Sequence, residues 1–333
     1  MQKKLFFSSL IIFLFAGLFL STSNSLADRV EKMKEVPVKN DFPVGPSQIE
    51  IEANPGEVIK KEIQIDNRAG EKRDFHIEVE DFEGSNTNPD QTVLLQGEKG
   101  GRYGAKDWFS LEKKDFSIEH GDRQYLDVTI EIPENADAGD HYTSVLVSMI
   151  PREVEKKEGS NVRITSRAGI LFFIKIKGVA TKAGEFKSFK VEKEWYWNLL
   201  GEKDKDGKIV NAVNLETTFG NSGTVRLRPS GKIEIKNMLG KTSDVIDVEA
   251  YNVLRDSVRQ MNYAWDKTGF RLGKYTATLK LDRGYDNLAD TKEVSFWIIP
   301  LKQILIGVLA FFLLIIIIYL LRKNIHIQIR KKQ

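Results

Sequence analysis

The chain has 333 residues, of which 41% are hydrophobic and none is cysteine. This hydrophobic content is sufficient for packed cores, and the lack of cysteine excludes disulfides, thiolate metal sites and a cysteine nucleophile. Seven of the 50 Lys and Arg residues, and none of the 47 acidic residues, lie in residues 1–27 and 322–333, so the rest has 43 basic against 47 acidic residues. Binding to nucleic acid requires a basic face, so this class of function is excluded.

The first 27 residues have the three parts of a secretory signal peptide: a start with two lysines, an apolar stretch and a small polar finish. Ser25 and Ala27 suit the −3 and −1 positions of a signal-peptidase site, which predicts cleavage between Ala27 and Asp28. An uncleaved N-terminal anchor is the alternative. Residues 28–45 are expected to form a linker.

Alternation of apolar and polar residues with a period of two dominates the region between the two ends, as in strands with one buried face. The run at residues 170–174 is apolar at every position, which indicates a strand covered on both faces. The predicted fold is all-β, with two tandem Ig-like antiparallel β-sandwiches and one C-terminal transmembrane helix. The alternating segments are residues 75–79, 126–132, 213–219, 275–281 and 294–298.

A small polar segment after Gly178 marks the boundary between the two predicted domains, at residues 46–180 and 181–300. Local correspondences suggest that they are copies of one another. Each has an early turn rich in Asn and Gly, which we interpret as a hairpin because these residues tolerate positive φ. Each also has a later strand that opens on Gly and Tyr. The corresponding segments are residues 66–70 with 220–223, and 138–143 with 272–276.

Near the C-terminus no residue between 304 and 321 is charged, and a helix of this length matches the thickness of a bilayer. We predict a transmembrane helix at residues 303–321 and a basic cytoplasmic tail at 322–333. The excess of Lys and Arg after the span orients it as a single-pass type I protein of the cell membrane with an extracellular ectodomain. The residues predicted at the membrane interface are Trp297, Lys302, Arg322 and Lys323.

Catalytic motifs are absent from the sequence, so the protein is predicted not to be an enzyme, and no cofactor or metal is expected. His76, His120 and His141 are scattered in the sequence and could converge on a metal, but they are expected to lie on the surface. Acidic residues at 78–83 could mimic a glycosidase pair but are expected to be solvated on an exposed strand face. The acidic segment at 202–209 resembles a calcium loop, although an ordinary hairpin turn at Asp206-Gly207 explains it equally simply.

Trp195, Tyr196 and Trp197 are the candidate ligand-binding residues. On a strand the two tryptophans share one face and Tyr196 takes the other, so at least one large aromatic side chain is exposed if one face is core. Such a patch serves sugar stacking or protein contacts; the alternative is core packing with an inter-domain contact. The Gly- and Asn-rich segment at 83–107 is expected to be mobile or to face a ligand.

The layout of signal peptide, two Ig-like domains, membrane span and short basic tail resembles the WxL-interacting proteins of Gram-positive surfaces. In domain one the similar segments are IEANPGE at 51–57, DF at 81–82, WFSL at 108–111, IPENADAGDHY at 132–142 and IKG at 176–178. In domain two they are FGNSG at 219–223, PSGKI at 229–233, GK at 240–241, SVR at 257–259, Trp265, GKY at 273–275 and SFWIIP at 295–300.

This resemblance implies that domain one binds peptidoglycan and that domain two binds a host or partner protein, in assembly with WxL-domain surface proteins. The leading hypothesis is therefore a non-enzymatic, membrane-anchored bacterial cell-surface protein that binds the cell wall and partner proteins. The alternative is a chaperone-like assembly factor for exported surface subunits, with an added strand at a sheet edge as a plausible contact mode. A wall-active hydrolase is a third possibility.

Overall fold

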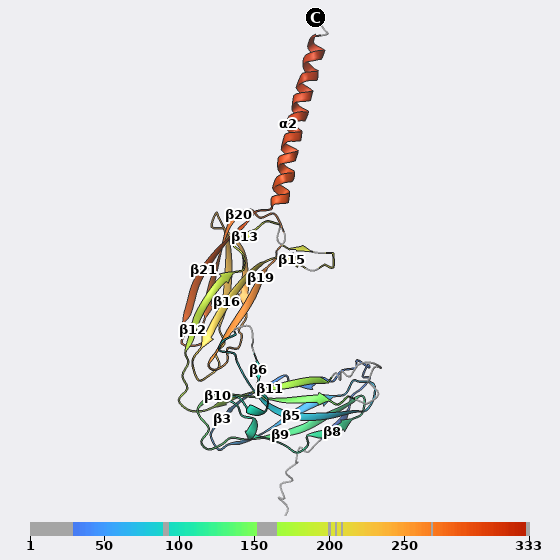
Figure 1. Cartoon of the computed structure of the whole chain (residues 1–333), viewed down its shortest axis with the longest axis vertical. Helices are drawn as coiled ribbons and strands as arrows, with labels where there is room; N and C mark the ends of the chain where they lie inside the picture. Colours follow the sequence, from blue (N-terminus) through green and yellow to red (C-terminus); the bar gives the residue numbers. More distant parts are fainter. Residues whose placement is uncertain are drawn as a thin grey trace, which may run out of the picture.

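The computed structural model describes residues 29–88, 93–151, 165–198, 201–203, 205–207, 209–267 and 269–330. Within these residues the chain is mostly β-strand, arranged in several sheets, with one long α-helix at the C-terminal end (Figure 1). The prediction of a β fold with a C-terminal helix is confirmed at this level. The predicted signal peptide, with its cleavage site between Ala27 and Asp28, lies outside the described residues.

Strands β1 to β11 form two sheets around one core, and we call this part the first unit. One sheet has the order β1-β9-β4-β2 with β7 on β9, and the other has the order β3-β11-β10-β5-β6 with β8 on β5. The strands are β1 Arg29–Lys32, β2 Val44–Gly45, β3 Gln48–Ala53, β4 Val58–Asp66, β5 Arg73–Glu83, β6 Leu94–Leu95, β7 Phe109–Leu111, β8 Asp115–Ile118, β9 Asp122–Glu131, β10 Gly139–Met149 and β11 Ser166–Ile176. Two short 3-10 helices, η1 Gly97–Lys99 and η2 Lys106–Trp108, lie between β6 and β7.

Strands β12 to β21 form the second unit around a separate core. Its sheets have the orders β12-β16-β19 and β13-β21-β20-β17-β18, and β14 with β15 makes a small hairpin at the position of the calcium-like segment. The strands are β12 Gly184–Val191, β13 Trp195–Tyr196, β14 Glu202–Lys203, β15 Ile209–Asn211, β16 Val213–Asn221, β17 Ser230–Asn237, β18 Thr242–Val248, β19 Ser257–Trp265, β20 Gly273–Asp282 and β21 Ala289–Ile298.

The period-two alternation is realised as expected in the first unit. In β9, Leu126, Val128 and Ile130 are buried in the core between the sheets, whereas the residues between them are less buried. In β11, Phe172 faces this core and Phe173, which points the opposite way, is also buried. This strand is therefore covered on both faces, because the second unit packs over its outer side.

Each unit contains the same kind of corner, where the chain crosses from one sheet to the other around a buried Asn. The predicted Asn/Gly hairpins at residues 66–70 and 220–223 are instead crossings from one sheet to the other. At each corner the Nδ2 amide group of a buried Asn donates to the backbone carbonyl oxygen of the residue four positions later. It also donates to one or two backbone carbonyl oxygens from a distant part of the chain. The Oδ1 atom of the same Asn accepts the backbone N–H of the residue two positions later. For Asn67 the partners are Glu71, Ile118 and Ala69, and for Asn221 they are Val225, Val253, Leu254 and Gly223.

Residues 29–45 are not a plain linker, because they contribute β1 and β2 and bury Phe42 in the first core. At the other end of the chain, α2 spans Leu301–Arg330, so it starts two residues before the predicted span and continues through the predicted tail as far as it is described. Its segment from Leu301 to Lys323 is long and apolar enough to cross a membrane, and its side chains are exposed.

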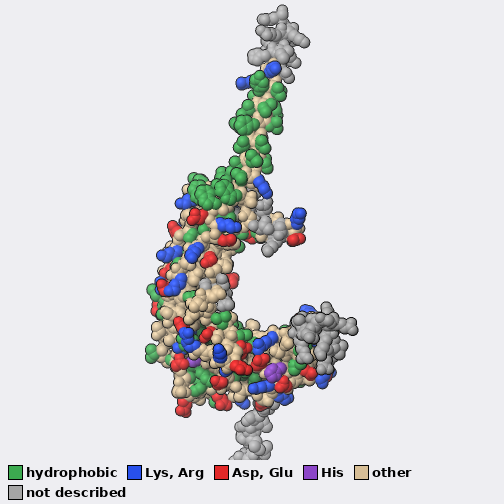
Figure 2. Space-filling view, in the orientation of Figure 1, with side chains coloured by type: hydrophobic (Ala, Val, Ile, Leu, Met, Phe, Trp, Pro, Cys, Tyr) green, Lys and Arg blue, Asp and Glu red, His purple; other side chains and the backbone are tan. Residues whose placement is uncertain are grey.

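The molecule is bent where the two units meet. Strands of the second unit run roughly along the long axis of the molecule and lead into α2, whereas those of the first unit run across it (Figure 1). The bend leaves a hollow on one side, between the first unit and the β14–β15 end of the second (Figure 2). The side chains that fix this bend form the first candidate site.

Candidate functional sites: the junction, an open strand edge and a tryptophan stack

An apolar cluster holds the two units together. Phe82, Tyr142 and Phe173 lie on the outer face of the first unit and bury Leu254 of the second. The ring centroid of Phe82 is 5.5 Å from that of Tyr142 and 5.6 Å from that of Phe173. Close aromatic packing of this kind stabilises beyond the area that it buries. The junction therefore has a small core of its own.

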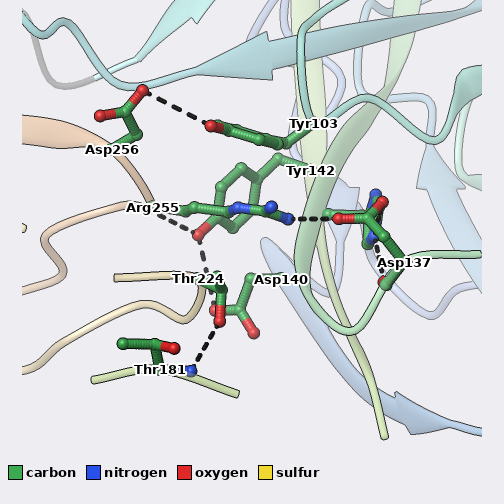
Figure 3. Close-up of polar contacts among 9 residues, drawn as sticks. Tyr103, Asp137, Asp140, Tyr142, Thr181, Thr224, Arg255 and Asp256 are labelled. Carbon is green, nitrogen blue, oxygen red and sulfur yellow. Dashed lines mark hydrogen bonds and ion pairs between the residues drawn. The ribbon is translucent and has the colours of Figure 1, made fainter. Parts of the chain in front are cut away.

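A layer of polar contacts surrounds this cluster (Figure 3). The backbone N–H of Arg255 donates to the Tyr142 hydroxyl oxygen at 2.9 Å, and the Arg255 guanidinium donates to Asp137 Oδ2 at 3.0 Å. The same guanidinium lies 3.8 Å from the centroid of the Tyr103 ring, within the range of a cation–π contact. Asp256 is paired with Arg102 in the first unit. The segment 254–256 is thus bound from three sides.

Asp140 is the buried carboxylate of the junction. Its side chain accepts the Arg226 N–H at 2.7 Å, and its own backbone N–H donates to the Thr224 carbonyl oxygen at 2.9 Å. Burial raises the pKa of Asp140, against the opposing effects of the Arg226 N–H and of the positive charges of Arg226 and Lys175. These contacts account for the burial of the Asp140 carboxylate, so its role is structural.

Gly139, next to it, is required by a close approach of the two units. Its φ is +118°, and a Cβ added there would lie 2.4 Å from the Thr224 carbonyl oxygen. Only glycine fits such a position without displacing the backbone opposite. Any larger residue would push the second unit away from the first.

The segment at 83–107, expected to be mobile or to face a ligand, is held in the junction where it is described. The Ser85 carbonyl oxygen accepts the Val258 N–H at 2.9 Å. The buried Asp81 carboxylate accepts N–H groups from Gly101, Ala105 and Lys106 at 3.1, 2.8 and 2.8 Å. Asp81, considered from sequence as one of a pair of hydrolase acids, is therefore occupied in ordering this loop.

The histidines are not all on the surface. His141 is buried, with its ring centroid 4.7 Å from that of Trp108 and Nε2 3.0 Å from the Asp137 carbonyl oxygen. His76 Nδ1 lies 2.7 Å from Asp115, and His120 Nδ1 accepts the Gly70 N–H. Among the described residues, no group of three or more His, Asp or Glu side chains is placed to hold a metal ion.

A strand edge of the first unit is open. β3 pairs with β11 only from Leu171 to Ile176, because the chain before β3 belongs to the other sheet, where β2 pairs with β4. Among the described residues, no strand pairs with residues 166–170 on this edge. Since the Leu171 N–H donates toward β3, alternation directs the N–H and C=O groups of Arg167 and Gly169 to the same open side.

The three candidate aromatic residues lie beside the start of α2. Tyr196 is buried in the second core, whereas the side chains of Trp195 and Trp197 are 45% and 52% exposed. Trp195 stacks between Trp197 and Trp297, with ring centroids 6.0 and 5.4 Å apart and planes within 15° and 9°. The three tryptophans therefore form one aromatic stack, and part of it remains exposed.

The predicted interface residues bracket the apolar part of α2. Lys302 is the second residue of α2, and Arg322 and Lys323 lie at the far end of its apolar segment. The rise of about 1.5 Å per residue separates these ends by roughly 30 Å, the hydrocarbon thickness of a bilayer. The two sets of cations therefore have the spacing of two membrane surfaces.

No family model matches the chain. No curated protein matches it either. Solved structures with a similar arrangement of strands include the class 5 fimbriae chaperone CfaA, at 8% identity over 76% of this chain and 98% of that chain, with a TM-score of 0.37. They also include the CsuC–CsuE chaperone–tip adhesion subunit complex of Acinetobacter baumannii (14% identity, 78% and 99% covered, TM-score 0.36) and the E. coli chaperone DraB (12%, 76% and 98%, 0.35). At these scores the likeness does not extend to what this chain binds.

These findings overturn the family prediction. The predicted membership of the WxL-interacting proteins is wrong, because no family model supports it and the similar solved structures are pilus chaperones. The predicted cell-wall function, with peptidoglycan, WxL-domain proteins and a host protein as partners, is wrong with it. The motifs behind the resemblance are turn and strand signatures, and these recur in unrelated β proteins.

Proposed function

We propose that the protein is a single-pass membrane protein whose two Ig-like domains, on the extracytoplasmic side, bind and position an exported partner polypeptide as an assembly factor, without catalysing a reaction. The observation that carries this proposal is the open edge of β11 on a unit whose orientation is fixed by the junction. A bare strand edge offers unpaired N–H and C=O groups to an added strand.

The anchoring rests on α2. Nearly all of its described apolar segment is exposed, and this composition favours a helix that lipid covers. The cations at its C-terminal end support a cytoplasmic location for that end, because Lys and Arg are more frequent on the cytoplasmic side of a membrane span. The units at its N-terminal end are then outside.

The assignment of two Ig-like domains rests on the repeated topology. β3 pairs in parallel with β11 in the first unit, as β13 does with β21 in the second. The buried Asn corners repeat as well, and among the described strands no sheet contains members of both units. These features support a domain boundary near residue 180, as predicted, with a first domain that also includes β1 and β2.

The β11 edge has side chains that suit strand addition. Residues 166–169 are Ser, Arg, Ala and Gly, which are small or flexible, and Ala168 and Met149 at this end of the first core are only partly buried. An added strand would continue the sheet along the line of β3 and cover the side chains of Ala168 and Met149. The backbone bonds would supply affinity, and the pockets for alternate side chains would supply specificity.

The experiment compares Arg167→Pro with Arg167→Ala in the full chain, produced in its own cells and cross-linked before purification from the membrane. Proline removes the outward N–H that an added strand would use, whereas alanine keeps it. Both variants lose the ion pairs of Arg167 with Glu78 and Glu80 and so match in that respect. Equal thermal melting of the two variants controls for folding.

We expect the cross-linked partner to decrease at least about tenfold in Arg167→Pro and to be retained in Arg167→Ala. Equal recovery of partner with both variants would refute strand addition at this edge. Recovery of released glycan fragments or other turnover products by the purified wild type would refute the non-catalytic function.

A further inference from the structure

The second unit is attached to α2 without a linker. β21 ends at Ile298 and α2 begins at Leu301. The Leu301 N–H donates to the Trp197 carbonyl oxygen at 3.2 Å, and the Ile299 N–H donates to the Tyr196 carbonyl oxygen at 2.7 Å. The start of the helix is therefore hydrogen-bonded to the unit, and a bilayer crossed by α2 must come close to the surrounding loops.

Two of these loops expose large apolar side chains. The register of the strands, with Asn237 opposite Tyr275 and Gly273 opposite Ile298, places the turn at 238–241 and the loop at 266–272 at this same end. Their exposed fractions are 59% for Met238, 85% for Leu239 and 65% for Phe270. A hydrophobic patch is visible at the end of the second unit, beside the start of α2 (Figure 2).

We call this surface the collar and define it as Trp195, Trp197, Met238, Leu239, Phe270 and Trp297. Clustered apolar side chains of this size are rare on surfaces that face only water. Tryptophan is enriched at the interface between lipid and water, where the ring meets the acyl chains and the indole N–H meets the headgroups.

Charged residues of both signs lie around the collar, as is compatible with contact with lipid headgroups. Lys274 lies directly across from Trp297 in the register of β20 and β21, and Lys241 lies in the turn beside Leu239. Glu194 and Asp266 lie in the neighbouring segments. Because both signs are present, the apolar side chains must supply the attraction.

We propose that the collar is a membrane-docking surface that inserts into the outer leaflet of the bilayer crossed by α2. This inference rests on the proposed anchoring. Docking would seat the second unit on the lipid instead of leaving it to swing on the helix, and the junction would pass this orientation to the first unit. The open edge of β11 would then be presented at a set distance from the membrane.

The test uses single-cysteine variants of the full chain, which has no cysteine of its own. Leu239→Cys and Phe270→Cys probe the collar, Gly307→Cys probes α2, and Leu288→Cys probes an exposed apolar position at the opposite end of the second unit. Each carries an environment-sensitive fluorophore in vesicles of phosphatidylcholine and phosphatidylglycerol. Nitroxide-labelled lipids, with the nitroxide near the headgroup or deep in the acyl chain, serve as quenchers.

We expect the shallow nitroxide to quench the probes at positions 239 and 270 about twofold or more, the deep nitroxide to quench position 307, and neither to quench position 288. If position 307 is quenched but positions 239 and 270 are no more quenched than position 288, docking is refuted while the anchoring stands. Quenching at only one of the two loops would refute a continuous collar. No quenching at 307 would refute the anchoring itself, and docking with it.

Discussion

Replacement of Asn221 by alanine tests whether the buried corner holds the second unit and its junction segment together. The side chain donates to three carbonyl oxygens at 2.8 to 3.0 Å and accepts one N–H at 2.9 Å. The Val253 and Leu254 carbonyl oxygens still accept the Leu227 N–H and the Ser257 hydroxyl in the variant. Alanine therefore removes the partner of the Val225 carbonyl and of the Gly223 N–H, at about 1 kcal/mol each, so the local free energy of opening should decrease by about 2 kcal/mol. Because Leu254 is one of the carbonyl partners, the loss also loosens the start of the junction segment.

Hydrogen exchange measured peptide by peptide is the appropriate assay, because two units are not expected to unfold in a single transition. About 2 kcal/mol corresponds to exchange about 30-fold faster in peptides that cover the end of β16 and the start of β19. Asn67→Ala should do the same in the first unit. Asn237→Ala is the matched control, because its Oδ1 accepts two N–H groups in an exposed turn, where water can replace it. An effect of Asn221→Ala no larger than that of Asn237→Ala would refute the reasoning.

Three further predictions concern the junction. Because burial raises the pKa of Asp140, the folded chain binds its proton more tightly than the unfolded chain does. The contribution of Asp140 to the free energy of unfolding should therefore fall as pH rises from its ordinary pKa of 3.8 through the raised pKa, and it should stay constant at higher pH. Asp140→Asn should remove this pH-dependent component from the free energy of unfolding measured in guanidinium between about pH 3 and pH 7. An unchanged pH dependence in the variant would contradict this. Tyr142→Phe removes the acceptor of the Arg255 N–H and should weaken the junction by about 1 kcal/mol, seen as exchange about fivefold faster at the 254–256 segment; unaltered exchange would count against that hydrogen bond. Arg255→Ala removes both the Asp137 ion pair and the Tyr103 ring contact, and should broaden the distance distribution between spin labels placed on one cysteine in each unit. A distribution as narrow as the wild type's would show that the apolar cluster alone fixes the bend.

Local patterns predicted what depends on local structure. Period-two alternation predicted the buried faces of the strands, and the same reasoning predicted that Tyr196 and its two flanking tryptophans point in opposite directions. The unbroken apolar run at 170–174 predicted a strand covered on both sides. In each of these cases the information lies within a few adjacent residues, so the sequence alone was sufficient.

The remaining features depend on contacts between distant residues. Residues that tolerate positive φ predict a turn but not whether the next strand joins the same sheet. The sequence therefore predicts hairpins at Asn67 and Asn221, where the structure has corners between two sheets. His141 is buried because Trp108 packs on it, and Asp81 is occupied by a loop that follows it in the chain. The bond between Arg255 and Tyr142 joins residues 113 apart, and no pattern in either segment indicates it. The family resemblance was wrong because strand and turn signatures describe a fold class and not a partner.

We propose that α2 crosses a membrane and holds both units outside it, and the labelling of two positions tests this most directly. Two single-cysteine variants of the full chain, Val58→Cys in the first unit and Lys323→Cys at the far end of the apolar segment, are treated in intact cells with a maleimide that cannot cross membranes. Both side chains are exposed, so topology alone decides whether they react. We predict labelling of Val58→Cys at once and of Lys323→Cys only after the cells are permeabilised. Protection of Val58→Cys, or equal labelling of both before permeabilisation, would contradict the account.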